Sequence, residues 1–169
     1  MKKTHYITQA AVIAALYAVL THLQNLLLPG STTWAIQMRV SEAMMVLAFF
    51  TPAAIPGLSL GCLVFNLTYA GTLPLDPVVG TLATFLAAGG MWLTRNVKLG
   101  RLPVLGLLMP AVTNAVLVGW ELTVYIGGGF GLNALYVALG ELAVVAVLGS
   151  LLYTVIARRK LDKKVMAVG

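Results

Sequence analysis

Acidic side chains are scarce in this chain of 169 residues, and their positions suggest what chemistry it performs. There are five, and four of them lie in or beside long apolar stretches: Glu42, Asp76, Glu121 and Glu141. An ionisable group in a segment that crosses a membrane is costly and marks a functional site by default. A carboxylate can accept two N–H hydrogen bonds side by side. These residues therefore indicate a site for a ligand with N–H donors or a positive charge.

Other side chains near the same depth extend this site. Arg39 lies three residues before Glu42, so the two can meet on one helical face and neutralise each other. Glu121 and Glu141 are then left without a basic partner, and aromatic rings at this level could stack on a planar ligand. The candidate binding residues are Trp34, Gln37, Arg39, Glu42, Asn66, Tyr69, Trp120, Glu121 and Glu141. The alternatives are that the aromatic residues anchor the membrane interface and that each glutamate is protonated and bonds a neighbouring helix.

The composition is that of a membrane protein. Hydrophobic residues make up 60% of the chain and charged residues 9%, whereas a soluble domain has roughly 25% charged residues. A chain this apolar could not cover a surface with polar groups, which excludes a soluble enzyme, a nucleic-acid-binding domain and a disordered tail. The single cysteine, Cys62, excludes a disulfide scaffold and a cysteine-based metal cluster.

Six apolar segments are predicted to form helices, although a membrane-spanning helix needs about 20 residues and two of these are shorter. The segments are 7–27, 40–54, 57–69, 77–94, 103–126 and 132–157. Pro52 and Pro56 bracket the turn between the second and third, so a five-helix alternative would place two prolines inside one helix. Pro110 predicts a kink in the fifth. We expect an all-α integral membrane protein, a compact bundle of six transmembrane helices that forms one substrate-binding domain over residues 1–169.

Basic residues predict the orientation of this bundle. With six spans, ten of the eleven basic residues fall on the side that carries both termini, and only Arg39 falls on the other. Because basic loops stay inside, we expect both termini in the cytoplasm and the chain in the cell membrane. The net charge of +6 is then a topology signal and not a sign of nucleic-acid binding.

This orientation brings the polar residues to one layer. Glu121 lies about 8 Å and Glu141 about 13 Å below the outer end of its helix, at 1.5 Å per residue. Glu42, Asp76 and Asn66 also map to the outer third of the membrane. Convergence of four helices at one depth predicts a pocket that opens to the outside.

A different pattern marks the first helix. Ala10, Ala14 and Ala18 recur every four residues and form a smooth face that lets another helix approach closely. Spacing alone favours docking of a partner and internal packing equally. The chain has no G-x-x-x-x-G-K-[ST] phosphate loop, so it cannot hydrolyse ATP by itself, and we expect no cofactor.

Two sequence blocks resemble a known family. The basic N-terminus followed by ITQAAVIAALYAVLT resembles the first helix of the substrate-binding S components of energy-coupling-factor (ECF) transporters. The block QMRVSEAMM, from Gln37 to Met45, resembles the QueT family among them. Length, six segments and the basic tail agree with this resemblance over nearly the whole chain.

The resemblance implies a transport function, partner subunits and a location in a prokaryotic plasma membrane. S components of this kind are small six-helix proteins that bind a micronutrient from outside and join one membrane scaffold subunit and two ATPase subunits. Ala10, Ala14 and Ala18 would touch the scaffold, and the S component would rotate within the membrane to deliver its ligand. QueT-like members are linked to queuosine precursors, which are 7-deazaguanines such as 7-aminomethyl-7-deazaguanine or queuine.

This ligand class agrees with the acidic residues. A deazaguanine offers N–H donors on its pyrimidine edge, and the aminomethyl form adds a cation. We expect Glu42 or Glu141 to take the guanine edge, Glu121 to meet the ammonium group, and Asn66 and Gln37 to recognise the carbonyl. The loop 28–37, which contains Trp34, has the composition of a mobile cover over the pocket.

Three alternatives remain at the sequence level. The chain could be an S component for another small vitamin-like ring compound. It could be an independent homo-oligomeric transporter, but the inner half has almost none of the polar residues that a water or ion path needs. A membrane enzyme would need a nucleophile or metal set beside Glu121 and Glu141, and none is evident. We therefore expect that the chain is not an enzyme.

Overall fold

The computed structural model describes residues 3–32, 36, 38–100 and 102–161, and every regular element in this part of the chain is a helix. The elements in chain order are α1 (Lys3–Leu27), η1 (Val40–Phe49), α2 (Ala54–Thr68), α3 (Asp76–Thr94), α4 (Val104–Leu107), α5 (Met109–Tyr125), α6 (Phe130–Val144), η2 (Val145–Gly149) and α7 (Ser150–Arg159). η1 is a 3-10 helix and η2 is a short π-helical stretch between α6 and α7.

Each of the six predicted segments corresponds to helical structure, with two interruptions. The fifth segment is divided into α4 and α5 at Leu108, just before Pro110, because proline lacks the N–H that would bond to the preceding turn. The sixth segment runs through α6, η2 and α7. η1 and α2 are separate elements, so the alternative that merges them is wrong.

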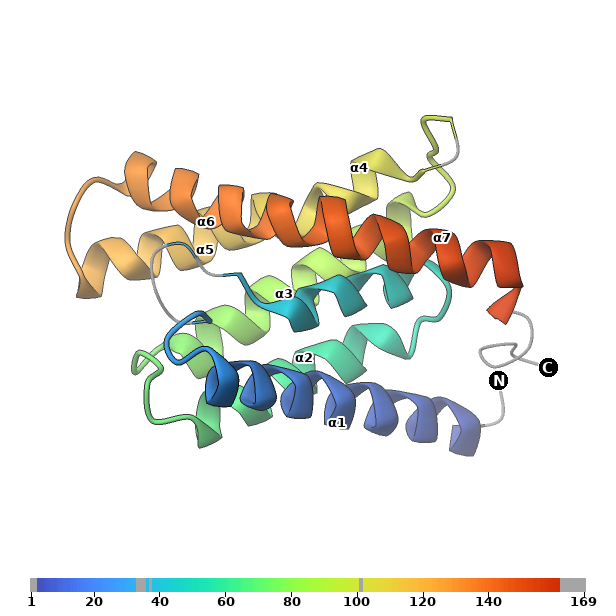
Figure 1. The fold of residues 1–169 in the computed structure, drawn as a ribbon, viewed down its shortest axis with the longest axis horizontal. Coiled ribbons are helices and arrows are strands. Elements are labelled where there is room, and N and C mark those ends of the chain that lie inside the picture. The colour runs from blue at the N-terminus through green and yellow to red at the C-terminus, as the bar shows by residue number, and fades with distance from the viewer. Residues whose placement is uncertain (1–2, 33–35, 37, 101, 162–169) are drawn as a thin grey trace.

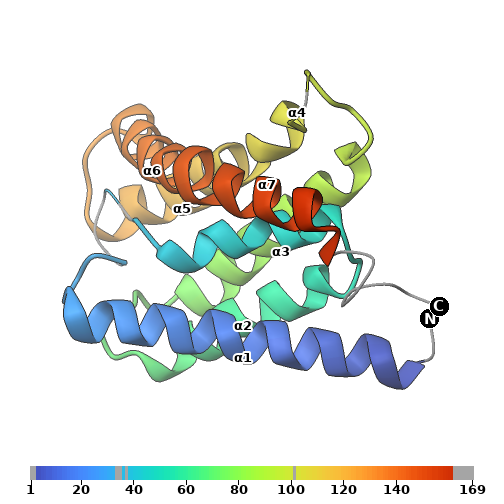
Figure 2. The same cartoon turned by 45° about the vertical axis from the view of Figure 1, so that its right-hand side comes forward.

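The helices form an elongated bundle in which sequence neighbours pack side by side (Figure 1). α1 packs on α2, α2 on α3, α3 on α5 and α5 on α6. η1 lies in the middle and contacts α1, α3, α7 and η2 (Figure 2). Eight of its ten residues are buried. The interior position of η1 agrees with the expectation that such a short apolar segment needs protein around it.

The contact between α1 and α2 depends on glycine. A Cβ at Gly57 would lie 2.8 Å from the carbonyl oxygen of Ala10, and one at Gly61 would lie 2.8 Å from that of Ala14. Only glycine allows the two backbones to approach this closely. Ala10 and Ala18 are buried in the same region. Ala10 and Ala18 therefore contribute to packing within the chain, and Ala14 between them is half-buried.

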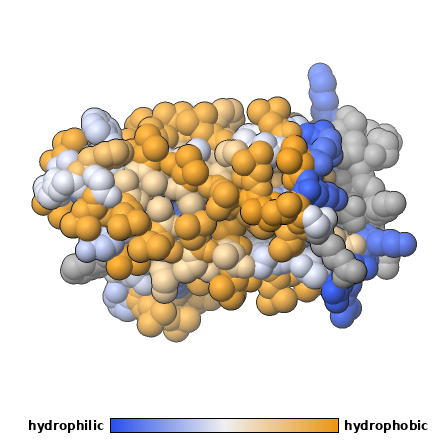
Figure 3. Space-filling model, turned by 90° about the horizontal axis from the view of Figure 1, so that it is seen from above, coloured by the Kyte–Doolittle hydropathy of each residue, from blue (hydrophilic) through white to orange (hydrophobic). Residues whose placement is uncertain are grey.

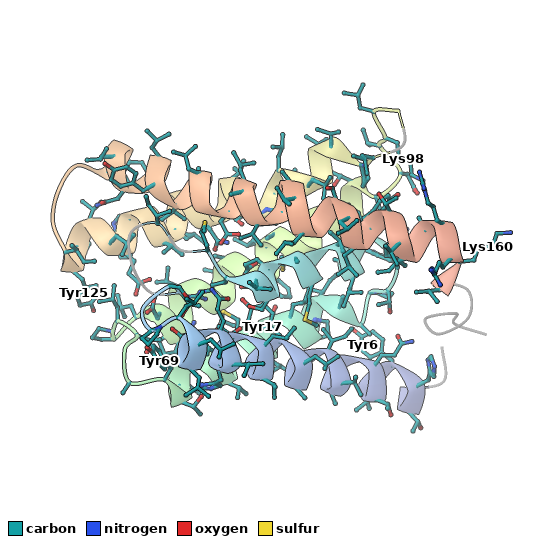
Figure 4. The ribbon with its side chains drawn as sticks, viewed as in Figure 1. Tyr6, Tyr17, Tyr69, Lys98, Tyr125 and Lys160 are labelled. Carbon is teal, nitrogen blue, oxygen red and sulfur yellow. The ribbon has the colours of Figure 1, made fainter. Side chains whose placement is uncertain are left out.

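The surface has the pattern expected in a bilayer. Apolar side chains cover most of the face seen in Figure 3, and the most hydrophilic side chains gather at one end of it. Lys98 and Lys160 lie at this end, where α1 also begins, and we call it the basic end (Figure 4). Tyr69 and Tyr125 lie at the opposite end.

Four helical stretches are long and apolar enough to cross a membrane: Lys3–Leu27, Asp76–Thr94, Val104–Tyr125 and Phe130–Arg159. η1 and α2 are apolar but shorter. These features define a multi-pass helical membrane protein.

Candidate binding site in the bundle interior

Four carboxylates from four helices are buried inside the bundle. They are Glu42 on η1, Asp76 at the start of α3, Glu121 on α5 and Glu141 on α6, and each is at most 5% exposed. Glu42 and Glu141 interact electrostatically, as do Asp76 and Glu121. The structure thus brings together the acidic residues that the sequence placed at one depth.

Arg39 is the buried cation among these acids. It interacts electrostatically with Glu42 and Asp76. Its Nε donates a hydrogen bond of 2.9 Å to the carbonyl oxygen of Thr32, and its guanidinium carbon lies 5.5 Å from the centre of the Phe65 ring. One cation against four carboxyl groups leaves an excess of acceptors in the interior.

Glu42 and Glu141 each have one oxygen bound and one free. The hydroxyl of Tyr17 donates to Oε1 of Glu42, and the amide of Asn114 donates to Oε1 of Glu141 at 2.8 Å. The Oε2 atom of each glutamate is buried without a hydrogen-bond partner among the described residues. The hydrogen bond between Asn114 and Glu141 joins α5 to α6, which agrees with the alternative that a glutamate bonds a neighbouring helix.

Glu121 has neither oxygen bound. Both carboxylate oxygens are buried and lack a hydrogen-bond partner in the described part of the chain. The neighbouring Asp76 accepts a hydrogen bond of 2.6 Å from the backbone N–H of Leu73, which fixes it at the start of α3. Glu121 lies within side-chain hydrogen-bonding reach of Asp76, so the two acids form a pair that can share one proton.

Asn66 adds a further free acceptor. Its amide nitrogen donates to the backbone carbonyl of Asp76 at 2.9 Å and points to the sulfur of Cys62 at 3.4 Å. Its Oδ1 is buried without a partner among the described residues. Gly80 makes room for this amide, because a Cβ there would lie 2.9 Å from the Asn66 nitrogen.

These unpaired atoms have a common chemistry. Carboxylate and amide oxygens accept hydrogen bonds, and a buried acceptor without a donor is unfavourable by about 1–3 kcal/mol or more. Native proteins rarely keep such atoms without a reason. A ligand that brings several N–H donors, and a positive charge, would satisfy them together.

Two side chains near the end of α1 bind the described residues that flank the start of η1. Gln24 donates from Nε2 to the carbonyl oxygen of Met38 at 2.5 Å and accepts a bond of 2.7 Å from the backbone N–H of Val40. Asn25 donates to the hydroxyl of Thr32 at 2.5 Å. Trp34, the predicted lid residue, and Gln37 lie outside the described residues.

Two predicted aromatic residues are not in the interior. Trp120 is 50% exposed, so it faces outward and does not lie among the buried acids. One residue on an α-helix turns the direction of the side chain by about 100°, which places Trp120 on a different face from the buried Glu121. Tyr69 is half-buried at the end of α2, where its ring stacks on that of Phe65 at 5.3 Å.

Sequence reasoning missed Tyr17 and Asn114 as partners of the glutamates. A signal for Tyr17 was present, because it lies in the middle of the first apolar segment and not at an end, where membrane tyrosines gather. The signal for Asn114 is its spacing of seven residues from Glu121, which is two turns of one helix face.

Comparison with known proteins identifies the family of this chain. A profile described as QueT transporter matches residues 7–158. This covers most of the sequence, and the chain belongs to the QueT transporter family. Because the family consists of transporters, the expectation that the chain is not an enzyme is confirmed.

One relative is the queuosine precursor transporter QueT of Lactococcus lactis subsp. cremoris (strain MG1363). It is 36% identical over 92 residues, which are 52% of this chain. The aligned part spans 50% of the length of that relative. No solved structure matches the chain significantly.

Proposed function

We propose that this chain is the substrate-binding subunit of an importer for a queuosine precursor, a 7-deazaguanine such as 7-aminomethyl-7-deazaguanine or queuine. The observation that carries the proposal is the set of unpaired buried acceptors on Glu42, Asn66, Glu121 and Glu141. A deazaguanine supplies N–H donors along its pyrimidine edge, and the aminomethyl form supplies a cation. Burial of a charged amine is tolerable only beside such partners.

The proposed topology has six spans with both termini in the cytoplasm. Lys98 and Lys160 lie at the end where α1 begins, in agreement with the rule that basic segments remain inside. Glu121 lies one turn before Tyr125, which is the last residue of α5 and lies at the end of the molecule opposite the basic end. We call Glu42, Asn66, Glu121 and Glu141 the acceptor cluster. In this orientation the acceptor cluster is nearer the outer surface of the cell membrane, from which the substrate comes.

The proposed energy source is an ECF-type module of one scaffold subunit and two ATPases. The sequence contains no phosphate loop of its own, and its first helix resembles those of S components. ATP would thus be used by partners, and this chain would need no cofactor. Co-purification of a co-expressed ECF scaffold and its ATPases with the tagged chain tests this, and a chain that purifies alone contradicts it.

Calorimetric titration of the purified chain in detergent tests the binding function. The ligands are 7-aminomethyl-7-deazaguanine, queuine and guanine, each titrated into the same preparation. We expect tight binding of a deazaguanine and much weaker binding of guanine. A folded chain that binds none of the three would contradict the proposal and direct attention to other ring compounds.

A further inference from the structure

The acceptor cluster has two ends, and α5 sets the distance between them. Asn114 and Glu121 are seven residues apart on this helix. Seven residues correspond to about 10 Å along the axis and a rotation of only about 20°, so both side chains lie on one face. Asn114 holds Glu141 at one end, while Glu121 and Asp76 form the other. Such a separation suits a bicyclic ring with one substituent.

The two ends differ in how their oxygens are used. At the α3–α5 end, neither oxygen of Glu121 receives a hydrogen bond from a donor among the described residues, and the Asp76 carboxyl group lies beside it. At the other end, Glu42 and Glu141 offer one free oxygen each, and their second oxygens are bound by Tyr17 and Asn114.

Arg39 does not fill either position. Its Nε is bonded to the carbonyl oxygen of Thr32, and its Nη1 points to the sulfur of Cys62 at 3.9 Å. The free oxygens of Glu42, Glu121 and Glu141 have no hydrogen-bond partner among the described residues, Arg39 included. Arg39 therefore reduces the negative potential without using the acceptors.

Each end matches a different group of a ligand. A planar edge with two parallel N–H bonds fits a single carboxylate that has both oxygens free, as in a bidentate pair. An ammonium group is a compact charge with three donors, and it can bond two oxygens from different side chains. η1 and α6 contact each other, so an ammonium group held between Glu42 and Glu141 would gain from both carboxylates.

We infer that Glu42 and Glu141 form an ammonium subsite and that Glu121 binds the N–H edge of the ring. This inference rests on the proposed function and specifies it further, since it makes the site selective for a ring that carries a cationic amine. It reverses the roles expected from the sequence, in which Glu121 met the ammonium group. The reversal comes from the hydrogen bonds of Tyr17 and Asn114, which the sequence did not show.

A matched pair of ligands tests the assignment. 7-Aminomethyl-7-deazaguanine carries the cation, and its 7-hydroxymethyl analogue has the same shape without the charge. The purified full chain is titrated with each. We expect the parent chain to prefer the amine by roughly 10- to 100-fold, which is the value of one or two charge-assisted hydrogen bonds.

The variants separate the two ends. Glu141→Gln and Glu42→Gln are each expected to weaken the amine more than the analogue and so to reduce the preference to about threefold or less. Glu121→Gln is expected to weaken both ligands by at least about tenfold and to keep the preference. Asn133→Ala is the control, because Asn133 is a buried amide on α6 that bonds Thr123 and Gly127 instead of the acids. It should leave the preference unchanged.

The outcomes are distinguishable. Loss of the preference in Glu121→Gln, with the preference intact in Glu141→Gln and Glu42→Gln, would overturn the assignment. Binding of both ligands to the parent chain without preference would also overturn it and leave the proposed function standing. If the folded parent chain, checked by size exclusion and thermal unfolding, binds neither of these ligands nor queuine, the proposed function itself fails.

Discussion

Removal of one hydroxyl group from Tyr17 tests whether the buried acids are organised as described. Tyr17 is fully buried on α1 and donates to Oε1 of Glu42 on η1. Tyr17→Phe keeps the ring and its packing but leaves both oxygens of Glu42 without a donor, because its Oε2 already lacks one. The change should therefore destabilise the chain and weaken the contact between α1 and η1, which the hydrogen bond from Thr21 to Ser41 would still join.

The size of this effect can be bounded. Hydrogen bonds between neutral groups of membrane helices contribute about 0.6 kcal/mol on average. A hydrogen bond to a charged group contributes about 1.5–3 kcal/mol. Since the acceptor here is a fully enclosed carboxylate, we expect a loss of about 2 kcal/mol in the free energy of unfolding.

Unfolding of the detergent-solubilised chain by increasing SDS, followed by circular dichroism, measures this loss. Tyr153→Phe is the matched control, because Tyr153 is also buried and makes ring contacts with Phe49 and Phe50 away from the acids. It should change stability by less than about 0.5 kcal/mol, as ordinary substitutions do. Equal effects of the two variants would refute the role assigned to the Tyr17 hydroxyl.

Three further predictions concern packing, the loop and the outer surface. Gly61→Val should destabilise the chain by about 1–3 kcal/mol, because its Cβ would lie 2.8 Å from the Ala14 carbonyl oxygen; SDS unfolding measures this, and an unchanged midpoint would contradict the close packing of α1 and α2. Gln24→Ala removes the hydrogen bonds to Met38 and Val40 at the connection between α1 and η1, so the bound deazaguanine should dissociate about tenfold faster. Stopped-flow dilution measures the dissociation rate, and an unchanged rate would show that this connection does not limit release. Trp120→Ala should leave the calorimetric affinity for the deazaguanine within about twofold, because the side chain faces outward. A large loss of affinity would show that Trp120 belongs to the binding site.

Helix positions could be predicted from the sequence where local signals are strong. α3 begins at Asp76, one residue before the predicted segment 77–94, because proline fits the first turn of a helix. It ends at Thr94, as predicted. The 3-10 form of η1 could not be predicted, since it depends on the helices packed around Val40–Phe49 and not on an apolar pattern that an α-helix shares.

The depth of the site residues was predictable, but their directions were not. Glu121 and Trp120 are adjacent and share a depth, yet one is buried and the other is half exposed. Apolar residues surround both in a membrane helix, so hydrophobicity does not reveal which face is interior. The same limit applies to Ala10 and Ala18, where the spacing indicated a smooth face and only the structure showed Gly57 and Gly61 against it.

The central claim is that the buried acceptors of four helices form the substrate site. The most direct measurement is an experimental structure of the chain with 7-aminomethyl-7-deazaguanine bound. Our account predicts the ring edge within hydrogen-bonding distance of Glu121 and the ammonium group between Glu42 and Glu141. A ligand bound elsewhere, with these carboxylates still unpaired, would contradict it.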